Sequence, residues 1–298
     1  MLWQVLVATA CLYFLFLTTI STYTRLPNSH GHTSTIYLLP PQINATTPLI
    51  CKSVHPHFAT TLFPVEKDVY ERFSTAQDTP SGLLTYHGIH TSIPSGLILE
   101  LAENGNLQDW LDGAAAQPPS EDLVYKWTSQ AAEALSFTHN LGILHSDIHP
   151  LNFFLTSSLD LKVGDWGGAS VDGSLSHCSY RYKYRLFTSN GTDIAKEFGI
   201  SAATEIFAFG MTVFVLVSGQ EVWPELEESR DWEEIRDRIS TRRFPRTKDL
   251  RVLGSVVEGC WNGRFSSMEE VRVAVERERD ASRERDAASL QQVPFTAK

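Results

Sequence analysis

Cysteine is scarce in this chain. Only four cysteines occur among 298 residues, Cys11, Cys51, Cys178 and Cys260, and no two of them form a CxxC pair. Closely spaced cysteine pairs are typical of zinc sites and of disulfide frameworks, so the sequence predicts neither. A reducing compartment is the simpler expectation.

Positive charge is also in short supply. The chain has 25 Lys and Arg against 35 Asp and Glu, which gives a formal net charge of −10. Because nucleic acid requires a basic face, we expect no nucleic-acid partner. No internal repeat is evident, and the length predicts one or two domains. A hydrophobic content of 42% is enough for a sizeable core.

Charge is absent altogether from the first 24 residues. Residues 2–20 approach the roughly 20 apolar residues that a membrane helix needs. No basic stretch precedes them and no small-x-small cleavage site follows, which disfavours a cleaved signal peptide. Since Lys and Arg favour the cytoplasmic flank, Arg25 predicts a single-pass membrane protein with the rest of the chain in the cytosol. The alternatives are a buried helix or strand in a cytoplasmic protein, or a misjudged start codon.

Residues 34–104 have the pattern of a β-rich region with one helix. Apolar runs predict strands at 35–39, 49–54 and 96–101, and apolar residues spaced four apart predict a helix over 64–73. A polar turn at 103–106 follows.

Beyond this turn the pattern becomes helical. Ser120, followed by two acidic residues, is an N-cap for a helix that reaches about residue 140. Residues 204–218 are apolar nearly all round, which indicates a helix inside a large core. A last helix opens with a capping box at 266–269. We expect it to give way to a solvated charged run at 277–285.

The most informative stretch reads HSDIHPLN over residues 145–152 and continues with VGDWG over residues 163–167. It places Asp147, Asn152 and Asp165 in one short, hairpin-like region. Phosphoryl transfer needs a carboxylate that orients a hydroxyl and accepts its proton, and Asp147 fits this role. It also needs oxygen ligands for Mg²⁺, and Asn152 and Asp165 fit that one.

This spacing resembles the protein-kinase catalytic loop H-R-D-x-x-x-x-N and the metal-binding D-F-G. The order of the elements resembles the whole protein-kinase domain over residues 26–278. The resemblance implies an α+β, two-lobed fold, with a small β-rich lobe and one helix at about 26–102 and a larger helical lobe at about 103–278. Residues 1–25 would precede this domain, and a charged, polar tail at 279–298 would follow it.

The resemblance also implies an ATP-dependent protein kinase. It would transfer the γ-phosphate of Mg-ATP to a hydroxyl of a protein substrate, with Ser or Thr favoured over Tyr. Asp147 would orient and deprotonate that hydroxyl, and Asn152 and Asp165 would hold Mg²⁺. Lys52 would clamp the α- and β-phosphates, and Glu66 would hold Lys52. The alternative for Lys52 is an ordinary strand lysine.

A nucleotide pocket is implied as well. Gly31 is the one glycine that remains of the phosphate-covering loop, where glycines let the backbone approach phosphate closely. The rest of the pocket would be Ile36 and Phe154 on either side of the adenine, the backbone of Glu100 and Ala102, and Leu99 as gatekeeper. These residues are equally suited to an ordinary core.

The two motifs depart from the family pattern at three positions. Ser146 replaces the arginine that would read activation-loop phosphorylation, His149 replaces a lysine, and Trp166 replaces the phenylalanine of D-F-G. Ser146 and His149, together with the reduced glycine loop and the missing A-P-E element, favour a pseudokinase, which would bind nucleotide or act as a scaffold without turnover. A third alternative is a small-molecule kinase of similar architecture.

Two further positions follow from the resemblance. Glu205 stands where the family has an aspartate in a central helix of the large lobe. Asp193 stands in place of the glutamate of A-P-E, and the resemblance implies that it pairs with Arg264. The alternative is that Asp193 and Arg264 are both exposed to solvent.

Overall fold

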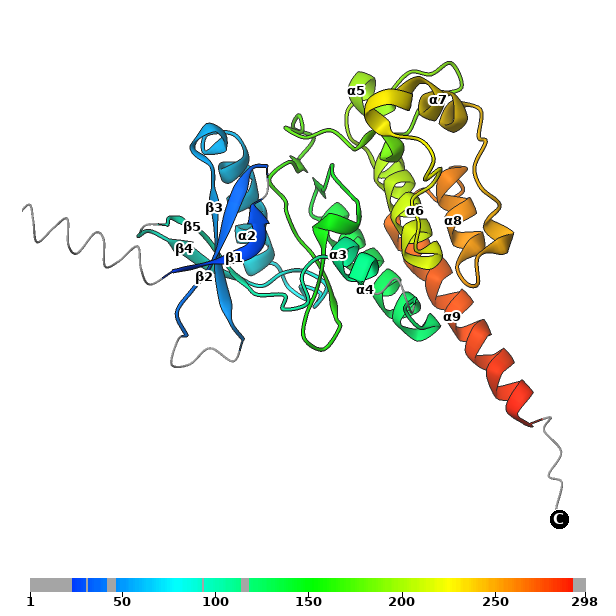
Figure 1. Ribbon diagram of the computed structural model, residues 1–298, viewed down its shortest axis with the longest axis horizontal. Helices are drawn as coiled ribbons and strands as arrows, with labels where there is room; N and C mark the ends of the chain where they lie inside the picture. The colour runs from blue at the N-terminus through cyan, green and yellow to red at the C-terminus, as the bar shows by residue number, and fades with distance from the viewer. Residues whose placement is uncertain (1–22, 31, 42–46, 93, 114–117, 292–298) are drawn as a thin grey trace, which may run out of the picture. The chain divides into compact units, whose positions relative to one another are not determined.

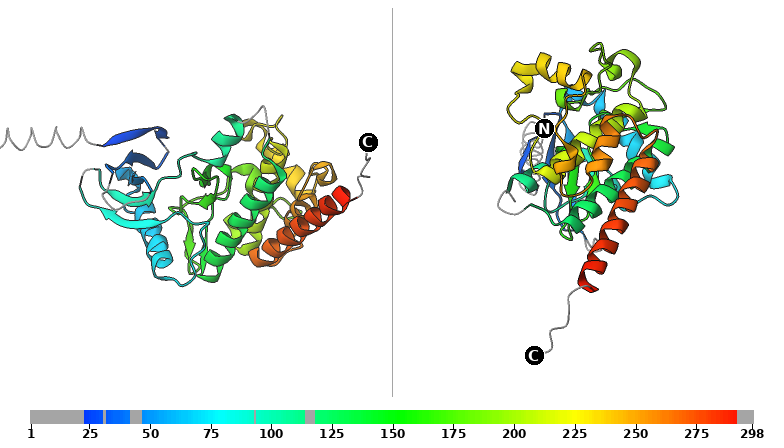
Figure 2. Two further views of the ribbon diagram at one scale, coloured as in Figure 1. Left: turned by 90° about the horizontal axis from the view of Figure 1, so that it is seen from below. Right: turned by 90° about the vertical axis from the view of Figure 1, so that its right-hand side faces the viewer.

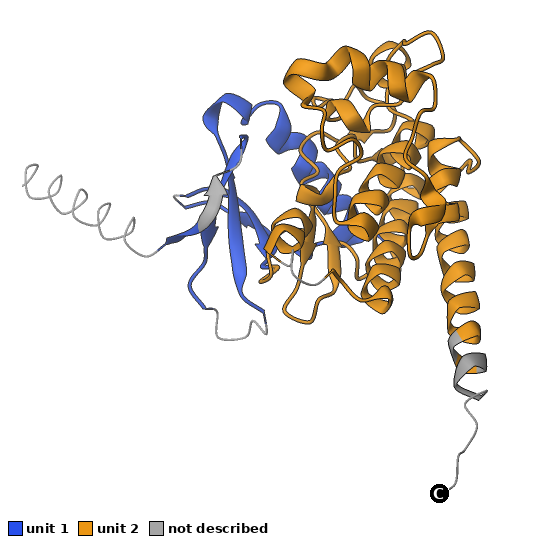
Figure 3. Cartoon of the chain, turned by 45° about the vertical axis from the view of Figure 1, so that its right-hand side comes forward, with its two compact units in different colours: residues 1–76, 84–101 blue, residues 77–83, 102–298 orange. Residues whose placement is uncertain are grey.

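The structure is a computed structural model that describes residues 23–30, 32–41, 47–92, 94–113 and 118–291. The chain forms two compact units, coloured separately in Figure 3. Unit 1 consists of residues 1–76 and 84–101, and unit 2 of residues 77–83 and 102–298. The functional domain boundaries inferred from the sequence stay a prediction.

Unit 1 is built on an antiparallel sheet with the strand order β1-β2-β3-β5-β4 (Figure 1). Its strands are β1 Thr24–His30, β2 Ser34–Leu38, β3 Leu49–Val54, β4 Tyr86–His90 and β5 Gly96–Glu100. A short 3-10 helix, η1 Pro56–Phe58, and α2 Leu62–Thr75 follow β3 in the chain. The strands predicted at 35–39, 49–54 and 96–101 and the helix predicted at 64–73 are confirmed, with shifts of their ends.

The two edge strands have no visible strand pattern in the sequence. β1 contains Pro27, and its pairing with β2 is irregular between Arg25 and His30. Proline cannot donate a backbone hydrogen bond and is therefore confined to edges and bulges. In β4, Gly88 has a φ of 105° and lies at the end of a register shift against β5. Both segments lack the alternation that would have predicted them.

Unit 2 is mainly helical. Its helices are α3 Leu107–Gly113, α4 Glu121–Asn140, α5 Ile194–Phe198, α6 Ala202–Ser218, α7 Glu228–Ser240, α8 Gly254–Trp261 and α9 Met268–Gln291. Short 3-10 helices lie at η2 Pro150–Asn152, η3 Tyr182–Tyr184 and η4 Thr247–Asp249, and short strands at β6 Ile143–Leu144, β7 Phe153–Leu155, β8 Leu161–Val163 and β9 Ser170–Val171. Figure 2 shows α4 and α9 packed side by side. A sheet with α2 in one unit and a mainly helical second unit confirm the predicted α+β fold.

The predicted end of the last helix is wrong. α9 continues through the charged run at 277–285 to Gln291. Glu and Arg have high helix propensity, so a charged segment can stay helical. Arg272 also pairs with Glu269 and Glu276 at 2.6 Å, three and four residues away on the same helix face.

The predicted membrane localisation is also corrected. In the part of the chain that the structure describes, no helix is both long enough and apolar enough to cross a membrane. α6 is apolar but has only 17 residues, and nearly all of them are buried. α4 and α9 are longer but carry charged side chains along their length. Residues 2–20, the predicted span, lie outside the described residues.

The turn between β7 and β8 is fastened to α4. The Asp160 carboxylate accepts hydrogen bonds from Ser158 Oγ at 2.6 Å and Gln130 Nε2 at 2.9 Å, and lies 2.9 Å from Lys126 Nζ. The hydrogen bond from Ser158, followed by that from Lys126, lowers the pKa of Asp160 to about 2. The ionised carboxylate therefore ties this turn to the helix.

We expect Asp160→Asn to lower the free energy of unfolding by about 0.5–1 kcal/mol at pH 7, a small value because the side chain is 39% exposed. A depressed folded-state pKa gives stability that is present above the unfolded pKa of about 4 and is lost as pH falls through about 2. Urea unfolding at pH 7 and pH 3 should show a smaller difference at pH 3. A difference independent of pH would contradict this, and Asp249→Asn is the exposed control.

Candidate active site

Asp147 lies in the loop that connects β6 to η2 in unit 2, and its side chain is 28% exposed. Its Oδ2 accepts a hydrogen bond from Asn152 Nδ2 at 3.1 Å, and the same nitrogen donates to the Asp147 carbonyl at 2.7 Å. Its Oδ1 lies 3.3 Å from His149 Nε2. The carboxylate is thus oriented from both sides and remains partly accessible, as a base for an incoming hydroxyl must be.

His149 lies beside this carboxylate. Its Nδ1 accepts the Leu151 N–H at 3.3 Å, which leaves the proton of the neutral ring on Nε2, and Nε2 lies 3.3 Å from both Asp147 Oδ1 and Asn152 Nδ2. Sequence reasoning placed an imidazole here as a substitute for a phosphate-binding lysine. It missed the contact with Asp147, which only a spacing of two residues could have suggested.

His145 connects the loop to the segment that contains Asp165. Its Nε2 lies 3.0 Å from the Gly164 carbonyl, and its Nδ1 accepts the Asp147 N–H at 3.3 Å. A single tautomer with the proton on Nε2 satisfies both bonds. The buried imidazole also lies 4.5 Å from the Trp166 ring, centroid to centroid.

The β7–β8 hairpin brings the two predicted metal ligands to one end of a two-stranded sheet. Phe153 pairs with Val163, and the Gly164 N–H donates to the Asn152 carbonyl at 3.0 Å. Asp165 follows immediately with a φ of 65°, a left-handed conformation that aspartate tolerates better than most residues. Such backbone strain is typical of functional sites.

The donor set at this end of the hairpin fits Mg²⁺. Asn152 turns its Nδ2 toward Asp147, and among the described residues nothing donates a hydrogen bond to its Oδ1. Asp165 adds carboxylate oxygens. No group of three or more His, Cys, Asp or Glu suited to a metal occurs within the described ranges. Mg²⁺ needs no such group, because it uses one or two protein oxygens together with waters and phosphates.

Unit 1 contains a buried ion pair. Lys52 in β3 and Glu66 in α2 lie 2.7 Å apart, Nζ to Oε1, with side chains that are 8% and 1% exposed. The predicted pair therefore forms, whereas its roles toward phosphate stay a proposal. Lys67, the lysine that follows Glu66 in the chain, pairs instead with Glu71 on the same helix at 2.6 Å. Removing two charges from water costs free energy, so a buried ion pair contributes little net stability. Its presence therefore suggests a role other than stabilising the fold.

The residues predicted for the nucleotide pocket are distributed over both units. Ile36 lies in β2 opposite Lys52, and Leu99 is buried in β5 opposite Ile50. The Glu100 carboxylate accepts hydrogen bonds from the Thr85 amide and hydroxyl. In unit 2, Ala102 is buried and Phe154 is half-buried opposite Lys162, and Gly31 lies outside the described residues.

Comparison with known proteins places this geometry in a family. The protein kinase domain model matches residues 84–272. The chain belongs to the protein kinase family. A probable serine/threonine-protein kinase of Saccharomyces cerevisiae, FMP48, is 34% identical over 143 residues, which cover 41% of this chain and 38% of that protein.

Two plant kinases are similar as well. CBL-interacting protein kinase 29 of Oryza sativa is 34% identical over 130 residues, covering 41% of this chain and 27% of its own length. Mitogen-activated protein kinase kinase 10 of Arabidopsis thaliana is 25% identical over 212 residues, covering 68% and 61%. The chain spans less than two thirds of each of these relatives.

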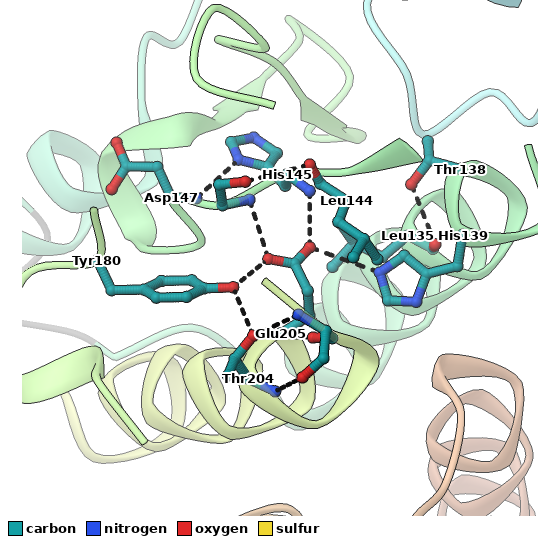
Figure 4. A network of polar contacts seen from close by, with 11 residues as sticks. Leu135, Thr138, His139, Leu144, His145, Asp147, Tyr180, Thr204 and Glu205 are labelled. Carbon is teal, nitrogen blue, oxygen red and sulfur yellow. Dashed lines mark hydrogen bonds and ion pairs between the residues drawn. The ribbon is translucent and has the colours of Figure 1, made fainter. Parts of the chain in front are cut away.

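In this member of the family, Glu205 of α6 holds the loop that carries Asp147 (Figure 4). It is completely buried, and its two oxygens accept the backbone N–H groups of His145 at 2.8 Å and Ser146 at 2.9 Å. Burial alone would raise the pKa of Glu205, but the hydrogen bond and charge of His139, at 3.5 Å, together with smaller contributions from His145 and Tyr180, hold it below its usual value. An ionised carboxylate therefore anchors the loop that carries Asp147.

The predicted pair of Asp193 and Arg264 is wrong. Asp193 lies 3.4 Å from Arg185, and Arg264 lies 3.4 Å from Glu258. Asp193 is also the N-cap of α5 and accepts the Lys196 N–H at 3.2 Å. The short side chain of Asp193 is held at the start of α5 by its role as N-cap. Its cationic partner is therefore Arg185, which lies eight residues earlier in the chain.

Proposed function

We propose that this kinase transfers the γ-phosphate of Mg-ATP to a serine or threonine hydroxyl of a protein substrate. The observation that carries the proposal is the Asp147 carboxylate, oriented by Asn152 and His149 and still partly exposed. Relatives that are named serine/threonine kinases support the choice of acceptor.

Each residue has a role in this reaction. Asp147 orients the acceptor hydroxyl and takes its proton as the oxygen attacks. Asn152 and Asp165 hold Mg²⁺, and Lys52, kept in place by Glu66, binds phosphate oxygens. When bound, Mg-ATP supplies the phosphoryl group and the cation that balances the phosphate charge. The protein contributes mainly positioning and electrostatic stabilisation.

A direct assay tests this proposal. The purified chain is incubated with Mg-ATP labelled in the γ-phosphate and with casein and histone as general acceptors, and the phosphoamino acids are identified. We expect phosphoserine or phosphothreonine. Phosphotyrosine alone would overturn the assignment of the acceptor.

A pseudokinase is the second candidate, favoured by Ser146 and His149 at positions where the family has basic residues. It predicts nucleotide binding without transfer to any acceptor. A small-molecule kinase would transfer phosphate to a metabolite pool but to neither protein. The same assay, repeated with a metabolite pool as acceptor and with nucleotide binding measured in parallel, distinguishes these three outcomes.

Asp165→Ala is expected to remove most of the Mg-dependent stabilisation by ATP. In the wild type, ligand at about 100 times its Kd stabilises by roughly 2.7 kcal/mol. The variant lacks carboxylate oxygens beside Asn152 and should keep only the weaker, Mg-independent part. Thermal unfolding with ATP, with and without Mg²⁺, measures this, and Asp249→Ala is the control. An unchanged Mg-dependent shift would show that the metal is held elsewhere.

A further inference from the structure

Tyr180 connects the segment after Asp165 to Glu205. Its ring is 1% exposed, and its hydroxyl donates a hydrogen bond to Glu205 Oε1 and lies 3.3 Å from Thr204 Oγ1 (Figure 4). Burial, followed by the charge of Glu205, raises the pKa of Tyr180 well above its ordinary value. The hydroxyl therefore keeps its proton and acts as a donor.

The same Glu205 oxygen accepts the backbone N–H of Ser146. Ser146 has a φ of 72°, a conformation that is strained for a residue other than glycine. Its peptide must be held in place by its surroundings, and hydrogen bonds to a carboxylate are among the stronger ones available. Tyr180 thus acts on the acceptor that holds the backbone next to Asp147.

The residues after Tyr180 are held by carboxylates. The N–H groups of Tyr182 and Lys183 donate to the Glu228 carboxylate at 3.1 and 3.0 Å. The Lys183 ammonium lies 2.9 Å from Glu221. These contacts hold the backbone that follows Tyr180.

The catalytic loop has no guanidinium at position 146. In its place, the hydroxyl of Tyr180 reaches the loop through Glu205. Arg185 holds the other end of this link, because its Nε donates to the Tyr180 carbonyl at 2.8 Å. The connection thus runs from Arg185 through Tyr180 and Glu205 to the catalytic loop.

We propose that Tyr180 is a positioning residue for phosphoryl transfer: through Glu205 it links the segment 166–193 to the loop that carries Asp147. This proposal rests on the proposed kinase function. It names the chemistry by which the segment is ordered, a tyrosine hydroxyl on a buried carboxylate.

Tyr180→Phe tests the link, because it keeps the ring and removes only the hydroxyl. We expect kcat to fall about tenfold or more, as for the loss of a hydrogen bond to a charged group, with KM for ATP unchanged. Tyr125→Phe removes another buried tyrosine hydroxyl, in α4, and should leave kcat unchanged. A normal kcat in Tyr180→Phe, or an equal loss in Tyr125→Phe, overturns the proposal.

Hydrogen–deuterium exchange gives a readout that needs no turnover. The amides of His145 and Ser146 should exchange faster in Tyr180→Phe than in the wild type, and Tyr125→Phe should match the wild type. Unchanged exchange in Tyr180→Phe overturns the link even in an active enzyme. Faster exchange in a chain that transfers no phosphate supports the link and refutes only the proposed kinase function.

Discussion

Asp147→Asn is expected to lower kcat for phosphoryl transfer by about 10²–10⁴-fold, the usual contribution of a general base. An amide has nearly the same size as the carboxylate but cannot accept the proton of the attacking hydroxyl. Affinity for ATP should stay close to that of the wild type, because this residue acts on the acceptor. A large fall in kcat with an unchanged affinity for ATP would therefore identify Asp147 as the base that acts on the acceptor hydroxyl.

The measurement pairs steady-state transfer with ATP binding by calorimetry. Asp160→Asn is the matched control, because it makes the same chemical change in the turn of the adjacent hairpin. It should retain full activity below its unfolding temperature, so a loss in Asp147→Asn cannot be assigned to a loosened hairpin. Equal turnover in the wild type and Asp147→Asn would exclude Asp147 as the base.

The local part of this site could be predicted from the sequence. Asp147 and Asn152 are five residues apart, and the Asn152 amide bonds directly to Asp147 within one loop. A short spacing of this kind depends little on the rest of the fold. The Lys52–Glu66 pair spans a strand, a turn and a helix. The pattern of apolar residues predicted the strand and the helix, and the family resemblance predicted the pair.

The remaining contacts could not be predicted, because they join residues that only tertiary packing brings together. Glu205 lies 60 residues from His145 along the chain and 25 from Tyr180. A single tyrosine in a loop has no periodicity and no spacing that marks it. The resemblance gave the position of Glu205 but neither the hydroxyl of Tyr180 nor the imidazole of His139 beside it.

The sequence also failed to predict the end of the last helix and the two edge strands, for a related reason. β1 and β4 are edge strands with irregular register, and their sequences lack the alternation that makes a strand visible. α9 extends through a charged run because its own side-chain pairs stabilise it. The central, buried helix α6 was predicted correctly, because its almost entirely apolar composition is enough to indicate a buried helix.

Lys52→Met is expected to have two large effects. Removal of a positive group that holds phosphates should lower kcat by about 10²–10³-fold, as for other preorganised electrostatic contacts. It should also lower the free energy of unfolding by about 3–5 kcal/mol, because Glu66, with a side chain that is 1% exposed, is left without its cation. Activity alone therefore cannot separate a lost contact to phosphate from a loosened unit 1.

The double variant Lys52→Met/Glu66→Leu separates them. Replacing a buried ion pair by apolar residues of similar volume is often neutral or stabilising, so the unfolding midpoint should return toward that of the wild type. Transfer should stay as low as in Lys52→Met, because no ammonium is present. Lys67→Met, which breaks the exposed pair with Glu71, should leave both transfer and the unfolding midpoint close to those of the wild type. Recovery of activity together with stability would mean that Lys52 serves the fold alone and holds no phosphate during transfer.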